Sequence, residues 1–125
     1  MDESSTATNT MWVLCGSDDP YEAFPPFMLA SGALALDMDV NMFFTMKGLR
    51  ILQNGVAEGI RLEGEARSLA DYIGVVQEAG ATLIACSAAL EIVGIPEDDL
   101  IDGLEFGGVA TFVNGAAEAD LVLTF

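Results

Sequence analysis

Few residues in this sequence can carry covalent chemistry. It contains two cysteines, Cys15 and Cys86, a single lysine, Lys47, and no histidine. The lack of histidine excludes Ser-His-Asp and Cys-His catalysis as well as imidazole metal ligands. Two cysteines cannot form a tetrathiolate zinc site within one chain and are too few for a disulfide scaffold. Covalent chemistry must therefore rest on a cysteine or a carboxylate, and cysteine chemistry would require neither a metal nor an organic cofactor.

Charge and composition exclude several other classes of protein. The chain has 125 residues, of which 52% are apolar, and its net charge is −16. Such a surface repels nucleic-acid phosphates and anionic lipid headgroups, so we expect neither nucleic-acid nor membrane binding. The acidic, polar opening does not resemble a signal peptide, and the longest apolar run, 23–36, is too short to span a membrane. We therefore predict a cytoplasmic protein with reduced thiols.

The excess of carboxylates over cations suggests a salty cell interior. Concentrated salt screens repulsion between surface carboxylates, so a halophile can maintain this composition. An acidic protein that is simply tuned for solubility is the alternative, and composition does not decide between the two.

Short apolar runs alternate with helical patterns along the chain. This alternation predicts a five-stranded, mostly parallel sheet in a single three-layer α/β/α domain, residues 11–125, after a flexible polar tail, residues 1–10. The predicted strands are 11–15, 39–45, 81–85, 104–106 and 120–125. The predicted helices are 21–38 (regular from about the prolines at 25 and 26), 65–79, 87–93 and 109–118, with helical turns at 49–52 and 98–101 and no assignment for 53–64.

The predicted strands bring the chemically capable residues to one edge of the sheet. Ligands of open parallel sheets gather at the carboxyl ends of the strands. Here those ends carry Cys15, Thr45 with Lys47, Cys86, and Gly107-Gly108. We therefore expect both cysteines and the lysine to share one rim.

Cys86 is the preferred candidate nucleophile, because it stands between a predicted strand and a predicted helix. The free amides and positive end of such a helix favour a thiolate. Ser87 could cap the same turn, and Lys47 or Arg50 could add positive charge. The alternative is that Cys86 is a small buried hydrophobic residue, as free cysteines often are.

The remaining candidates at this rim are weaker. The carboxylates of Asp18 and Asp19 follow Cys15 and disfavour a thiolate there, so we interpret Cys15 as structural, although a redox pair with Cys86 is possible. Gly107-Gly108 could present backbone amides to an anion. We interpret the acidic clusters as solvated surface and predict no metal site, because none has calcium-loop spacing.

The motifs resemble those of the DsrE/DsrF-like family over nearly the whole chain after the tail. The resemblance rests on Phe43-Phe44-Thr45 before Gly48-Leu49 and Leu52, Gly80-Ala81 before Leu83-Ile84-Ala85-Cys86-Ser87-Ala88-Ala89, Gly94-Ile95, Leu100-Ile101, Gly107-Gly108-Val109, and Ala119-Asp120 through Phe125. It implies a compact α/β/α domain that assembles into trimers or hexamers. In members similar to the TusD-like sulfur-relay subunits, the cysteine at the position of Cys86 carries sulfane sulfur as a persulfide.

Three functions remain in view from the sequence. The first is a sulfur carrier or sulfurtransferase subunit that loads a persulfide on Cys86 and passes it from a donor protein to an acceptor thiol. The second is a thiol peroxidase or redox sensor in which Cys15 could resolve an oxidised Cys86. The third is a non-catalytic homo-oligomer that binds a small ligand at the rim.

Overall fold

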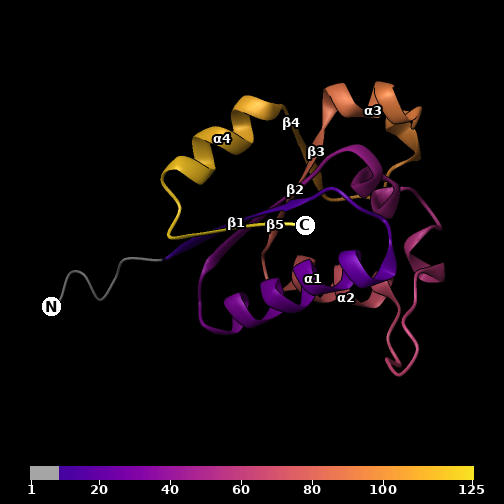
Figure 1. The fold of residues 1–125 in the computed structure, drawn as a ribbon, viewed down its shortest axis with the longest axis horizontal. Helices are drawn as coiled ribbons and strands as arrows, with labels where there is room; N and C mark the ends of the chain where they lie inside the picture. The colour runs from indigo at the N-terminus through magenta and orange to yellow at the C-terminus, as the bar shows by residue number, and fades with distance from the viewer. Residues whose placement is uncertain (1–8) are drawn as a thin grey trace, which may run out of the picture.

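A five-stranded sheet with every pairing parallel forms the centre of the molecule (Figure 1). Its strands lie in the order β4-β3-β2-β1-β5. The computed structural model describes residues 9–125, so most of the predicted polar tail lies outside the described residues. The strands are β1 Thr10–Cys15, β2 Asp39–Phe44, β3 Thr82–Cys86, β4 Leu104–Gly107 and β5 Leu121–Thr124.

The first strand begins at Thr10, one residue before the domain start predicted from the sequence. Thr10 already pairs with Asp39 in the sheet, and its amide donates to the Asp120 carboxylate at 2.8 Å. The Asn9 carbonyl accepts from the Asp39 amide at 2.8 Å. The polar side chains here do not show the apolar pattern of a buried strand, because backbone hydrogen bonds and the Asp120 carboxylate hold these residues in the sheet.

Helices cover both faces of the sheet, which confirms the predicted three-layer α/β/α architecture. In Figure 1, α1 and α2 lie below the sheet, while α3 and α4 lie above it. The helices are α1 Pro20–Ala35, α2 Leu69–Glu78, α3 Ser87–Val93 and α4 Val109–Ala117, with 3-10 helices η2 Met46–Leu52, η3 Ala57–Gly59 and η4 Glu97–Asp99.

Strand alternation assigns neighbouring aromatic residues to different layers of the core. Phe44 contacts Phe27 of α1, with ring centroids 5.9 Å apart, whereas Phe43 contacts Phe112 of α4 at 5.5 Å. Trp12 also meets Phe112 edge-on at 5.9 Å. A Cβ at Gly115 of α4 would overlap the Trp12 ring, so a glycine at this position lets α4 approach the sheet. The apolar runs therefore supply two core layers, one on each face.

The structure places the start of α1 earlier than the proline pattern predicted. The Asp19 carboxylate accepts from the Tyr21 amide at 2.9 Å, and Pro20 occupies the first helical turn. Pro25 and Pro26 then lie inside the helix rather than at its start. An N-cap aspartate followed by proline is a strong initiation signal, and it outweighs the two later prolines here.

The start of α2, in contrast, is later than predicted. Ser68 and Asp71 form a capping box: the Asp71 amide donates to Ser68 Oγ at 3.2 Å, and the Ser68 amide donates to Asp71 Oδ2 at 2.9 Å. Residues 65–67 therefore precede the helix instead of opening it. The Ser-x-x-Asp spacing carried this signal, although the sequence prediction did not use it.

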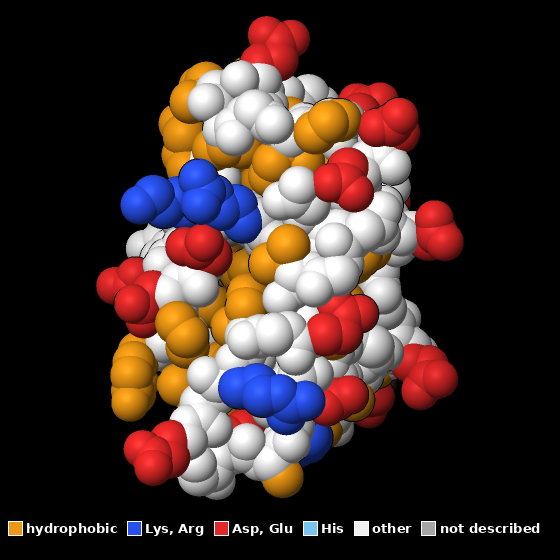
Figure 2. Space-filling view, turned by 90° about the vertical axis from the view of Figure 1, so that its right-hand side faces the viewer, with side chains coloured by type: hydrophobic (Ala, Val, Ile, Leu, Met, Phe, Trp, Pro, Cys, Tyr) orange, Lys and Arg blue, Asp and Glu red, His pale blue; other side chains and the backbone are white. Residues whose placement is uncertain are grey.

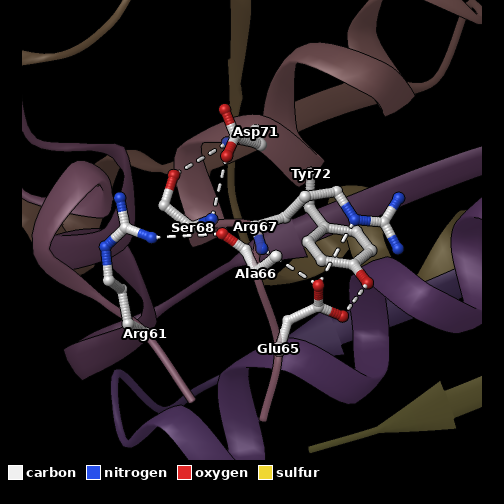
Figure 3. A network of polar contacts seen from close by, with 7 residues as sticks. All are labelled: Arg61, Glu65, Ala66, Arg67, Ser68, Asp71 and Tyr72. Carbon is white, nitrogen blue, oxygen red and sulfur yellow. Dashed lines mark hydrogen bonds and ion pairs between the residues drawn. The ribbon is translucent and has the colours of Figure 1, made fainter. Parts of the chain in front are cut away.

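Glu65 links the segment that precedes α2, residues 65–67, to the helix itself (Figure 3). Its carboxylate accepts from the Arg67 amide at 3.0 Å and from the Tyr72 hydroxyl at 2.8 Å. The Arg67 guanidinium lies 4.6 Å from the centroid of the Tyr72 ring. The Arg67 amide, followed by the Tyr72 hydroxyl, holds the pKa of Glu65 below its ordinary value. The same contacts favour the folded chain whenever Glu65 is ionised.

Replacing Glu65 with glutamine should therefore destabilise the protein in a pH-dependent way. A lowered folded-state pKa contributes stability above the unfolded-state pKa, and this contribution disappears as pH falls through the folded-state pKa. Urea unfolding of both proteins should show the larger difference at about pH 7 and a smaller one at about pH 3. An equal difference at both pH values would show that ionisation of Glu65 contributes nothing.

Candidate functional site

The sheet register places three of the predicted site residues in one row at its carboxyl edge. Cys86 pairs with Gly107 of β4, and Ala85 pairs with Phe44 of β2. One step beyond Phe44 is Thr45, which therefore stands beside Cys86 on the other side. Adjacent strands lie about 4.8 Å apart, so Gly107, Cys86 and Thr45 are immediate neighbours across the sheet.

Cys86 occupies the junction between β3 and α3. It is the last residue of the strand and the N-cap of the helix, with φ −75° and ψ 110°. The residue is 3% exposed, and its side chain makes no capping hydrogen bond to α3. Ser87 is the exposed first residue of α3 and not its cap, which differs from the predicted capping role. The thiol thus lies just beneath the rim, next to the first turn of a helix.

A sharp turn after β2 brings η2 against both β3 and α3. Thr45 is the N-cap of η2 but makes no side-chain capping bond, and Met46 has a φ of 51°. A positive φ is uncommon for a residue with a side chain, and such backbone occurs where the surrounding structure holds it in place. Lys47 and Arg50 are exposed on η2. Helix η2, which carries both cations, therefore packs against β3 and α3, the elements that meet at Cys86.

Gly48 fixes this turn against the end of β1. The Thr45 amide donates to the Cys15 carbonyl at 3.1 Å, and the Gly48 amide donates to the Thr45 carbonyl at 2.9 Å. A Cβ at Gly48 would overlap the Cys15 carbonyl. Only glycine allows the backbone of η2 to approach β1 this closely, so Gly48 positions the residues around it.

The structure does not bring the two cysteines together. Cys15 pairs with Phe44 and faces the α1 layer, whereas Cys86 is in the next row and faces the opposite layer. Strand β2 lies between them, which separates their backbones by about 9–10 Å. A disulfide requires Cα atoms within roughly 7 Å. Cys15 therefore cannot resolve an oxidised Cys86 in this fold, and the redox pair considered from the sequence is not supported.

Cys15 is a core residue, as interpreted from the sequence, but for a different reason than expected. It is buried, and burial raises the pKa of its thiol far above the ordinary value. The expected cause was the nearby carboxylates of Asp18 and Asp19. Desolvation alone keeps Cys15 a neutral thiol at physiological pH.

The Gly107-Gly108 backbone already makes a hydrogen bond within the chain. The Gly108 amide donates to the Thr111 hydroxyl at 3.1 Å, so this amide is not free for an anion. A Cβ at Gly107 would meet the same Thr111 side chain. Thr111 was missed in the sequence prediction, although a threonine three residues after a glycine N-cap is a recognisable signal.

Residues 9–125 contain neither a cluster of metal ligands nor a helix suited to span a membrane. No group of three or more cysteine, aspartate or glutamate side chains lies close enough to hold a metal ion. Within the same residues, no helix has the length and apolar character needed to cross a membrane.

Two solved structures share this fold. The ychN protein from E. coli superposes with a TM-score of 0.77 and 20% identity, covering 94% of this chain and 100% of that one. A protein of unknown function from Methanobacterium thermoautotrophicum gives a TM-score of 0.75 and 16% identity, covering 94% of this chain and 99% of that one.

Sequence comparison then defines the family. The DsrE/DsrF-like family model matches residues 9–125, and the chain belongs to this family. The chain is also 28% identical, over 141 residues, to the sulfur carrier protein DsrE2 of Allochromatium vinosum. That match covers 81% of this chain and 88% of the relative. The resemblance noted from the motifs is thereby confirmed.

Replacing Gly48 with alanine should destabilise the fold by about 3 kcal/mol, because the added methyl group must displace the Cys15 carbonyl. Gly59 is the matched control: it is exposed, and a Cβ there would meet nothing within 4 Å. We expect Gly59→Ala to change stability by less than about 0.5 kcal/mol. Chemical denaturation measures both, and equal effects would contradict the assigned role of Gly48.

Proposed function

We propose that this protein is a sulfur carrier that holds sulfane sulfur on Cys86. Membership of the DsrE/DsrF-like family and similarity to a sulfur carrier protein support this proposal. The observation that carries it is the position of Cys86 at the end of β3, in the row with Thr45 and Gly107. Of the two cysteines, it is the one at the strand–helix junction on the rim. Cys15, buried and facing the other layer, has no part in the reaction.

The proposed transfer is a balanced exchange at sulfur. The Cys86 thiolate attacks the outer sulfur of a donor persulfide, a new S–S bond forms, and the donor leaves as a thiolate. Cys86 then carries the sulfur as a persulfide. An acceptor thiolate attacks that outer sulfur and regenerates the Cys86 thiolate. No net oxidation occurs, so neither an oxidant nor a reductant is needed.

The 3% exposure of Cys86 favours a second candidate function. If the thiol is inert, the domain is a non-catalytic protein that binds a small ligand at the same rim. The two candidates differ in the reactivity of Cys86 in the folded protein, because a buried structural thiol resists alkylation.

The decisive experiment loads the native protein with a low-molecular-weight persulfide and maps added sulfur by mass spectrometry. We expect the mass of one sulfur atom on the peptide that contains Cys86, and release of that sulfur by an acceptor thiol. Cys86→Ser should abolish loading, whereas the matched Cys15→Ala variant should load normally. If Cys86 gains no sulfur and is not alkylated in the folded protein, the carrier function is refuted and the ligand-binding function is supported.

We also propose that the protein is a homo-oligomer, as the family resemblance implies. Helix α4 packs on the sheet through Phe112, yet its outer face presents Val109 and Val113, which are 69% and 58% exposed. These side chains are four residues apart and therefore form one apolar strip on the helix. Phe106, at the end of β4, is 46% exposed as well. Exposed apolar residues gathered on one element are typical of a protein interface.

Replacing Val113 with aspartate should therefore lower the mass of the assembly. Light scattering after size-exclusion chromatography should give a trimer or hexamer for the unmodified protein and a smaller species for the variant. Leu36 is the control, because it is 78% exposed at the end of α1, on the opposite layer. A monomer in every case, or dissociation by Leu36→Asp alone, would refute the α4 interface.

The cellular setting remains a proposal that rests on composition. We propose a cytoplasmic location, where donor and acceptor proteins of a sulfur relay keep their thiols reduced. We also propose a salty cell interior, because the chain has 20 acidic residues and only four basic ones. Screening by salt would remove the repulsion between the acidic residues.

A further inference from the structure

All the positive charge of this acidic protein lies in one short segment. Residues 47–67 contain all four basic side chains and three carboxylates, so the remaining chain carries 17 carboxylates and no lysine or arginine. Figure 2 shows Lys and Arg side chains in two groups on one face of the molecule. An anion that approaches the protein therefore meets a less negative surface along this segment than elsewhere.

Within the segment, Lys47 and Arg50 differ from the other two basic residues. Arg67 pairs with Glu65 at 3.4 Å, and the Arg61 guanidinium donates to the Ala66 carbonyl at 3.3 Å (Figure 3). Lys47 and Arg50 have no ion-pair partner within 4 Å among residues 9–125. Residues three apart in a 3-10 helix lie above one another, so both cations project from one ridge of η2.

This ridge belongs to the elements that meet at Cys86. Lys47 follows Thr45 by two residues, and Thr45 and Cys86 each come one residue after the paired residues Phe44 and Ala85. Consecutive Cα atoms are about 3.8 Å apart, so the Lys47 backbone is within roughly 12 Å of Cys86. Strand β3, α3 and η2 together contain two cations and one carboxylate, Glu91, against a net charge of −16 for the chain.

We propose that Lys47 and Arg50 select a small anionic sulfur compound as the reactant of Cys86, one that carries a carboxylate or sulfonate beside its reacting sulfur. This inference rests on the proposed sulfur-carrier function and names its substrate class. A small reactant also suits a thiol that is 3% exposed. Two cations within about 7–10 Å of an approaching anion change its rate by about three- to tenfold in water.

The test compares two alkylating agents that differ in charge. Iodoacetate is an anion and iodoacetamide is neutral, and the ratio of their rates at Cys86 cancels any change in the pKa of the thiol. We expect the double variant Lys47→Gln/Arg50→Gln to lower this ratio three- to tenfold in dilute buffer. The same variant should lower it far less in molar salt, where the Debye length is about 3 Å. Each single variant should give part of the effect.

Arg61→Gln is the matched control, since it removes one cation from the same segment away from η2. An unchanged ratio in the double variant, an equal loss in Arg61→Gln, or no alkylation of Cys86 by either reagent would overturn the inference. Persulfide transfer provides the second measurement: the double variant should slow transfer to 2-mercaptoethanesulfonate about three- to tenfold but leave transfer to neutral 2-mercaptoethanol unchanged. Failure of loading itself would instead refute the carrier, whatever the alkylation ratio.

Discussion

The single direction of all five strands is the constraint on which the rest of this molecule depends. Because each strand must return by a crossover, every carboxyl end meets at one edge, and residues far apart in the sequence become neighbours. Thr45 and Cys86 are 41 positions apart by number, yet each lies one residue beyond the paired residues Phe44 of β2 and Ala85 of β3. The close backbone contact between Gly48 and Cys15 then holds η2 against this edge. The backbone thus determines which residues lie at the rim, and their side chains determine which chemistry the rim can perform.

The same geometry gives the two cysteines different environments. In a parallel sheet, successive residues face opposite layers, so a shift of one row moves a thiol from one core layer to the other. The Cys15 side chain faces the layer that α1 covers, where burial keeps the thiol neutral. Cys86 ends next to α3 and to η2, the 3-10 helix that carries Lys47 and Arg50. The fold thus keeps the two free thiols apart by sheet geometry alone.

Sequence reasoning succeeded where backbone signals were strong. The bounds of α3 were predicted to the residue, because Gly94 adopts a left-handed conformation with φ 75° and ends the helix. The buried strands were recognisable as continuous apolar runs. The starts of α1 and α2 were wrong by one and four residues, because Asp19 and Ser68 cap those helices through short polar contacts that periodicity does not reveal. The separation of the cysteines onto opposite layers depends on register between distant strands, which the order of residues in the chain does not contain.

The contact between Trp12 and α4 gives this protein a built-in optical reporter. Trp12 is the only tryptophan in the chain, and its ring fits against Gly115 and Phe112 of α4. Its fluorescence therefore depends on whether one particular helix remains seated on the sheet, without any attached dye. Because that helix covers the same layer that Cys86 faces, the emission of a single native fluorophore can follow any rearrangement of that layer.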